Sequence, residues 1–122
     1  MIKSAILITR YLQAKGGLAT TGFIHKNWIN ALGYFMPAHF SCDWGDSWIT
    51  DIANMLGRKV FVDVYIEHMH FVNRKGPRGK THQERMARGG RDNVNEIYRK
   101  TLNERLQAVE KLKKFIEGYN GK

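Results

Sequence analysis

Acidic and histidine side chains occur here in an order that could serve group transfer. Asp46 lies in the turn Trp44-Gly45-Asp46-Ser47-Trp48, and His68 and His70 follow at the end of an apolar stretch. A carboxylate turned into a cleft can take a proton from a hydroxyl group and act as a general base. Aspartate is also one of the commonest helix caps, so Asp46 has a structural alternative. Asp43 is the nearby carboxylate that would replace it in catalysis.

The two histidines stand two residues apart at the end of a predicted strand. Side chains alternate across a strand, so His68 and His70 point to the same face and could reach one ligand. Two imidazole nitrogens are fewer than the four donors of a closed zinc site. The pair therefore predicts either part of a metal site or a polar rim.

A basic segment follows the histidines. Between positions 74 and 91 seven basic residues accompany one acid, Glu84, and they are Arg74, Lys75, Arg78, Lys80, Arg85, Arg88 and Arg91. Gly76, Pro77 and Gly79 predict a loop over 73–80. Its four cations, Arg74, Lys75, Arg78 and Lys80, could close over a diphosphate leaving group and offset developing negative charge. The alternative is a solvated charged loop.

Aromatic residues gather around the acidic turn. Trp48 falls at helical spacing with apolar neighbours, which predicts a core position. Trp44 precedes that helix in a polar loop, and a ring in such a place could stack on the apolar face of a sugar. We therefore expect Trp44 to contact substrate and Trp48 to be buried.

Taken together, these motifs resemble the carboxyl-terminal half of GT-A type glycosyltransferases of phages and bacteria. The resemblance runs from about Leu18 to Ile116 and is carried by a co-linear set: Leu32 to Pro37, Asp46, Trp48, Asp51 to Ala53, Leu56 to Arg58, Val64, Ile66 to His70, Asp92-Asn93, Tyr98, Thr101, Glu104-Arg105 and Lys111-Leu112. It implies transfer of a sugar from a nucleotide sugar to a hydroxyl acceptor, with Asp46 as general base.

The resemblance also implies a divalent cation, Mn²⁺ or Mg²⁺, that holds the donor diphosphate and takes His68 as a late ligand. Such enzymes carry a D-x-D metal motif in a nucleotide-binding half upstream, and no D-x-D triplet occurs here. We therefore expect the domain to be incomplete without that half, which a partner chain or a homo-oligomer would supply.

Local patterns predict the elements that position these residues. Apolar spacing predicts a first helix over 2–14, ended by Gly16-Gly17. A short strand is expected over 18–24, then a short helix capped by Asn27 and ended by Gly33. A second helix should begin at Asp46 or Ser47 and end at Gly57, and alternation predicts a strand over 59–66.

The carboxyl-terminal third has helical periodicity. A short helical piece is expected over 81–88, with Gly89-Gly90 separating it from a long amphipathic helix that starts near Asp92. Thr101 and Glu104 match a capping box, which predicts a break in the long helix. The predicted fold class is α+β: a small sheet with short helices and a long C-terminal amphipathic helix, in a partial GT-A-like domain.

Composition sets the remaining bounds. A chain of 122 residues predicts one domain, 1–122, divided into an N-terminal helix (1–17), an acceptor-side and metal-side core (18–72), the basic loop (73–80) and a helical segment (81–122). The formal charge of +9 favours anionic partners. The single cysteine, Cys42, favours a reducing compartment, and no apolar stretch is long enough for a membrane span, so a cytoplasmic protein is expected.

Two other functions fit the same features. One is a non-catalytic, self-associating remnant of a phage-type transferase, in which the apolar segment 2–14 covers the surface that the missing half would bury. The other is a basic nucleic-acid-binding module that uses the positive segment and exposed aromatic rings, although no recognised nucleic-acid motif is present. The transferase resemblance ranks ahead of both.

Overall fold

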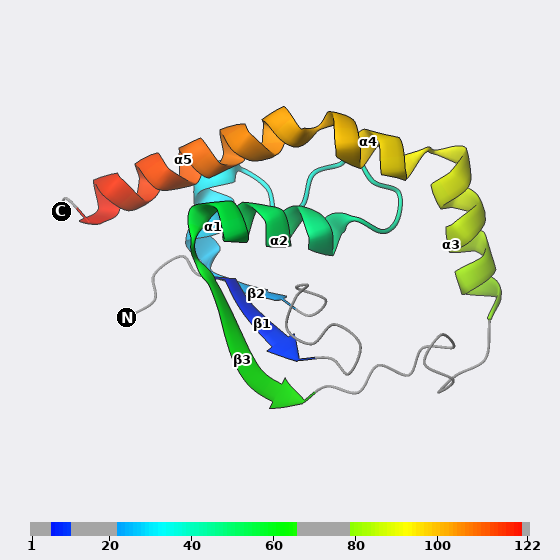
Figure 1. Ribbon diagram of the computed structural model, residues 1–122, viewed down its shortest axis with the longest axis horizontal. Coiled ribbons are helices and arrows are strands. Elements are labelled where there is room, and N and C mark those ends of the chain that lie inside the picture. Colours follow the sequence, from blue (N-terminus) through cyan, green and yellow to red (C-terminus); the bar gives the residue numbers. More distant parts are fainter. Residues whose placement is uncertain (1–5, 11–21, 66–78, 121–122) are drawn as a thin grey trace.

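The computed structural model describes residues 6–10, 22–65 and 79–120. The described chain is mostly helical, with three short strands. In chain order the elements are β1 (Ile6–Arg10), β2 (Gly22–Ile24), α1 (Lys26–Leu32), α2 (Gly45–Leu56), β3 (Lys59–Tyr65), α3 (Lys80–Arg91), α4 (Val94–Lys100) and α5 (Leu102–Asn120). In Figure 1, α3, α4 and α5 form an arc along one side, and α2 lies between α5 and the strands.

The strands form one sheet in the order β2-β1-β3. Strand β1 pairs antiparallel with β2, placing Ile6 opposite Ile24, and parallel with β3, placing Ile6 opposite Lys59. The helix predicted over 2–14 is therefore wrong at 6–10. The run Ile6-Leu7-Ile8 suits either state by local pattern, and pairing with strands on both sides selects the extended one.

Helices α1 and α2 both end at a glycine, as predicted. Gly33 has φ 85° and donates its N–H to the Ile29 carbonyl, and Gly57 has φ 68°. These left-handed conformations carry little steric cost for glycine. The predicted start of α1 is wrong by two residues, because His25 is the cap and its Nδ1 accepts the N–H of Asn27 at 3.1 Å.

The carboxyl-terminal helices differ from prediction in where they break. Helix α3 begins at Lys80, which had been assigned to the loop, and continues through Gly89-Gly90 to Arg91. Gly89 instead allows close approach of another segment, since a Cβ placed there would lie 3.3 Å from the Cys42 Sγ. The chain turns at Asp92 and Asn93, where Asn93 has φ 51°.

The predicted break at Thr101 is confirmed, although not through a capping box. The Thr101 hydroxyl donates to the Ile97 carbonyl at 2.7 Å, one turn back, which satisfies the end of α4. The Glu104 carboxylate pairs with His39 instead. The Thr101–Glu104 pattern thus predicts the correct helix boundary, but the hydrogen bonds that form there are not those of a capping box.

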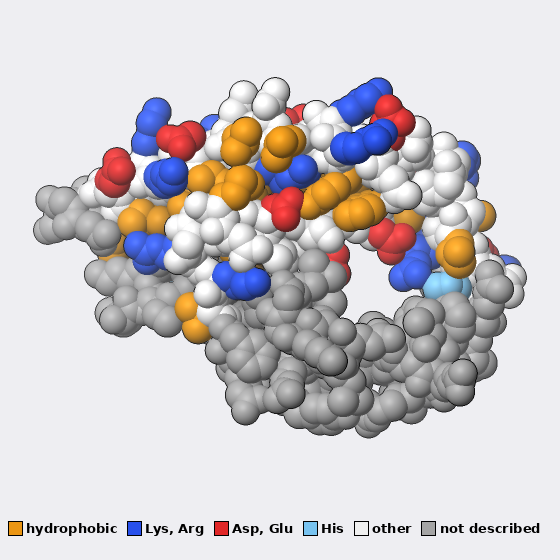
Figure 2. Space-filling view, in the orientation of Figure 1, with side chains coloured by type: hydrophobic (Ala, Val, Ile, Leu, Met, Phe, Trp, Pro, Cys, Tyr) orange, Lys and Arg blue, Asp and Glu red, His pale blue; other side chains and the backbone are white. Residues whose placement is uncertain are grey.

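The hydrophobic core lies where α1, α2 and α5 pack together. Its fully buried members include Trp28, Trp48, Ile52 and Leu112, so the core position predicted for Trp48 is confirmed. In Figure 2, acidic and basic side chains are interspersed along α4 and α5, with hydrophobic side chains gathered beside them. The core anchors α2 against α5, and the candidate site lies between the turn before α2 and helix α4.

Candidate functional site

Four of the predicted site residues lie within the described structure. Asp43, Trp44 and Asp46 stand at the start of α2, and Lys80 starts α3. Lys80 is almost fully exposed and lies 3.7 Å from Glu84, one turn along the same helix. The other five, His68, His70, Arg74, Lys75 and Arg78, lie outside the described residues.

Asp46 occupies the first turn of α2 rather than the cap position, so the cap assignment is wrong. Trp44 is the residue before the helix, and Gly45 is its first member. The Asp46 Oδ1 accepts the N–H of Ser47 at 2.9 Å, and its carbonyl accepts the Thr50 hydroxyl at 2.7 Å. Within the described part of the chain its other carboxylate oxygen makes no hydrogen bond, which leaves that oxygen able to accept a proton.

The turn before α2 has two consecutive residues in left-handed conformation. Asp43 has φ 54° and Trp44 has φ 59°. Such conformations cost non-glycine residues of the order of 1 kcal/mol each, and they persist where surrounding contacts hold them. Here α3 supplies the contacts: the Arg85 guanidinium lies 3.4 Å from the Asp43 carboxylate, and the Cys42 Sγ lies 3.5 Å from the Arg85 carbonyl oxygen.

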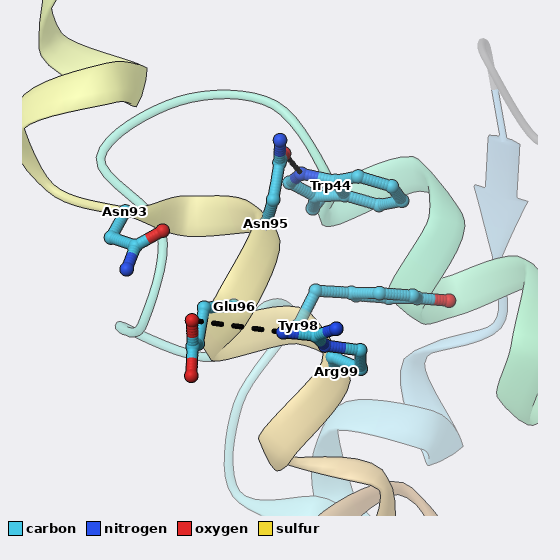
Figure 3. A pocket seen from close by; sticks show the side chains of 6 residues that line it. All are labelled: Trp44, Asn93, Asn95, Glu96, Tyr98 and Arg99. Carbon is cyan, nitrogen blue, oxygen red and sulfur yellow. Dashed lines mark hydrogen bonds and ion pairs between the residues drawn. The ribbon is translucent and has the colours of Figure 1, made fainter.

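This turn places the Trp44 ring against α4. Trp44 and Tyr98 are stacked, with ring centroids 4.4 Å apart and planes 20° apart. The indole N–H of Trp44 donates to the Asn95 Oδ1 at 2.7 Å, as Figure 3 shows. The ring predicted to act as a platform is therefore held on one face and at its polar edge by α4.

A hollow of about 400 Å³ opens beside the stacked rings. It is lined by Trp44 from the turn and by Asn93, Asn95, Glu96, Tyr98 and Arg99 around α4 (Figure 3). Glu96 also pairs with Lys100 at 2.9 Å and with Arg99 at 3.6 Å. The hydrogen bond from Lys100, with the positive charges of Lys100 and Arg99, lowers the pKa of Glu96. Aromatic, amide and charged groups thus converge on one space.

The buried residue Arg105 contacts the ring of Tyr98. Arg105 is 4% exposed, and its guanidinium lies 4.0 Å from the Tyr98 ring centroid and 5.2 Å from that of Trp48. It donates to the Tyr98 carbonyl at 2.8 Å, and its Nε lies 3.3 Å from the Asp51 carboxylate. The Tyr98 hydroxyl donates to that same carboxylate.

Burial, the hydrogen bond to Asp51 and the Asp51 charge raise the pKa of Tyr98 to about 12. Arg105 opposes this increase, and Asp46 adds to it. Because the phenol ionises with greater difficulty in the folded state, its neutral form contributes stability. That contribution is complete below pH 10.0, the ordinary pKa, and is lost as the pH rises to about 12.

We therefore expect Tyr98→Phe to remove part of the alkaline loss of stability. The free energy of unfolding would be measured by urea titration at several values of pH across this window. The difference in the free energy of unfolding between the wild type and Tyr98→Phe should narrow as the pH rises, because only the wild type loses the phenol's contribution. A difference that stays constant would show that Tyr98 ionises as an ordinary tyrosine.

A second hollow, of about 370 Å³, lies between the end of α1 and α5. Leu32, Tyr34, Glu104, Gln107, Ala108 and Lys111 line it. Its carboxylate, Glu104, is already paired with His39, and among the described residues no stacked aromatic pair lines it. The hollow beside Trp44 combines aromatic, amide and charged groups, so we take it as the candidate site.

Sequence reasoning identified Trp44 but missed its partners on α4. Asn95, Tyr98 and Arg99 lie 51 to 55 residues after Trp44 in the sequence, and Tyr98 fits the apolar stripe of a helix. The available signal was the set of polar residues that flank Tyr98 on α4. That pattern alone does not say which distant ring the helix meets.

No metal site is visible where the structure can be assessed. Within residues 6–10, 22–65 and 79–120, no three His, Cys, Asp or Glu side chains are grouped so as to hold an ion. Over those same ranges, no helix has the length and apolar character needed to cross a membrane. No protein-family model, curated protein or solved structure matches the chain.

Proposed function

We propose that this chain is the acceptor side of a GT-A-like glycosyltransferase and that it binds a carbohydrate beside Trp44. The observation that carries the proposal is the Trp44–Tyr98 stack at the edge of a hollow lined with amide and charged groups. Sugars present an apolar face to aromatic rings and hydroxyl groups to polar side chains, so both surfaces have partners here.

The polar groups of the hollow suit hydroxyl recognition. The Asn95 Oδ1 is engaged by the Trp44 indole, which leaves its amide nitrogen as a donor. Asn93 and Glu96 add an amide and a carboxylate to the same wall. Such groups form directional hydrogen bonds to ring hydroxyls while the indole supplies apolar contact.

Asp46 does not line the hollow, but its charge acts on Tyr98, which does. We assign activation of the acceptor to Asp46, the general base that the resemblance implies. In the proposed step it takes the proton of an acceptor hydroxyl as that oxygen bonds to the anomeric carbon of the donor sugar. The bond from the anomeric carbon to the phosphate oxygen breaks, and the nucleoside diphosphate leaves. Asp43 is less suited because Arg85 holds its carboxylate.

The donor side of the reaction stays a proposal. A nucleotide sugar with Mn²⁺ or Mg²⁺ would be held by groups that include His68 and His70, both outside the described residues. When bound, the cation would neutralise the diphosphate leaving group. A partner chain or a second copy would supply the nucleotide-binding half.

Charge pairing on α3 gives the nucleic-acid alternative less support. Lys80 pairs with Glu84, Arg85 with Asp43, and Arg91 with Asp92. Cations already neutralised in this way release fewer counterions on binding a phosphate backbone. The carbohydrate proposal rests on a shaped hollow instead.

Trp44→Ala is expected to abolish measurable saccharide binding, because it removes the ring that forms one wall of the hollow. Binding by the variant would be measured by titration calorimetry with a panel of methyl glycosides, and binding by the wild type also by tryptophan fluorescence. Trp28 and Trp48 are buried, so Trp44 is the indole positioned to respond to a ligand. Circular dichroism would verify that the variant is folded.

A matched control is available on α5. Tyr119 is an exposed ring stacked on Phe115, with planes 14° apart and centroids 6.5 Å apart. Tyr119→Ala removes an aromatic ring from a similar pair and should leave binding unchanged. If no saccharide in the panel alters the fluorescence of the wild type, the proposed function is wrong.

A further inference from the structure

The hollow beside Trp44 has one carboxylate, Glu96, and one cation, Arg99, in its described lining. Glu96 is its only lining carboxylate among the described residues, and it faces two cations, Lys100 at 2.9 Å and Arg99 at 3.6 Å. Lys100 does not line the hollow, so the charges of its lining residues, Arg99 and Glu96, sum to zero. The shorter ion pair of Glu96 is with Lys100, so Arg99 shares this carboxylate with a second and closer cation.

Arg99 is the cation best placed to meet a ligand. It lines the hollow directly, its side chain is 78% exposed, and its distance from Glu96 is the longer of the two ion pairs. A guanidinium has five N–H donors and binds carboxylate or phosphate groups with two parallel hydrogen bonds. The amide nitrogen of Asn95 adds a further donor to the same wall.

We propose that the saccharide bound beside Trp44 is anionic, with a carboxylate or phosphate group that pairs with Arg99. This inference rests on the proposed carbohydrate function and names its substrate class. The ring of the sugar lies against Trp44, and its acidic substituent lies toward α4. The Arg99 guanidinium and the Asn95 amide then supply hydrogen-bond donors to the acceptor oxygens of the acidic group.

The test compares sugars that differ in the charge of the substituent at carbon 6. Methyl glucoside, methyl glucuronide and glucose 6-phosphate would be titrated by tryptophan fluorescence at low salt, with inorganic phosphate as the anion without a sugar. We expect at least one anionic sugar to bind about three- to tenfold more tightly than the neutral glycoside, the range for an exposed charge-assisted hydrogen bond. Because the pair is exposed, raising the salt should reduce that preference.

Arg99→Gln should remove the preference, so that the anionic sugars bind no more tightly than the neutral glycoside binds to the same variant. Lys113→Gln is the matched control, because Lys113 pairs with Glu110 three residues away on α5, as Arg99 pairs with Glu96 on α4. That variant should keep the preference. The uronate and phosphate arms show which acidic group the hollow accepts.

Several outcomes would overturn the inference. Equal binding of neutral and anionic sugars by the wild type would exclude an anionic preference while leaving the proposed function intact. Inorganic phosphate that binds as tightly as the sugar phosphate would mean that Arg99 binds free anions. Absence of binding by every sugar would remove the proposed function together with this inference.

Discussion

Trp48→Ala is expected to lower the free energy of unfolding by about 3–5 kcal/mol. Trp48 is 1% exposed at the centre of the core, and its ring meets Phe40 with centroids 5.9 Å apart and His39 with centroids 5.8 Å apart. Removing it leaves a cavity at the junction of α2 and α5, and it also removes one of the two rings that contact Arg105. Urea unfolding followed by circular dichroism would measure the loss.

Two variants show whether this loss comes from the cavity. Trp48→Phe keeps an aromatic ring in place and should recover most of the stability. Trp44→Ala removes the same side chain from a partly exposed position, and we expect it to cost about 1–2 kcal/mol through the lost stacking and hydrogen bond. If Trp48→Ala cost no more than Trp44→Ala, the assignment of Trp48 to the core would be wrong.

Arg105→Met has the second largest expected effect on stability, about 2–4 kcal/mol. Methionine keeps an apolar side chain between the rings of Tyr98 and Trp48 but removes the charge. The Tyr98 carbonyl then loses a donor and Asp51 loses its ion pair. Asp51 is 40% exposed, so it regains some hydration, and the expected cost is below that of breaking a fully buried pair.

A double-mutant cycle with Asp51→Asn would isolate the pair itself. We expect a coupling energy of about 1–2 kcal/mol between the two sites. Lys113→Met on the same helix removes an exposed ion pair and should change the free energy of unfolding by less than about 0.5 kcal/mol. Equal effects of Arg105→Met and Lys113→Met would show that the buried arginine contributes no more than a surface charge.

Much of the helical layer could be predicted from local pattern. Gly33 and Gly57 end their helices because a left-handed residue is needed there, and that requirement is visible in the sequence. The strand at 59–65 follows from its alternation. The segment 6–10 could not be predicted in the same way, because its state depends on β2 and β3 rather than on its own residues.

The residues of the candidate site also differ in whether the sequence alone identifies them. Trp44 can be identified from the sequence as a candidate ligand-binding ring because it lies in a polar loop beside an acidic turn, where a core residue is not expected. Its stacking partner Tyr98 cannot, because on a helix its spacing is that of a buried position. The left-handed conformation of Trp44, which turns the ring toward α4, arises from contacts of the preceding turn with α3 and has no local signature.

The strand order of the sheet has a consequence for the folding pathway. Strand β1 is central, and its parallel neighbour β3 begins at Lys59, after α1 and α2 have intervened. Closing so long a segment costs chain entropy that grows with the logarithm of its length, and such high contact order slows folding. We therefore expect helices α1 and α2 to form before the sheet is complete, because their contacts are local.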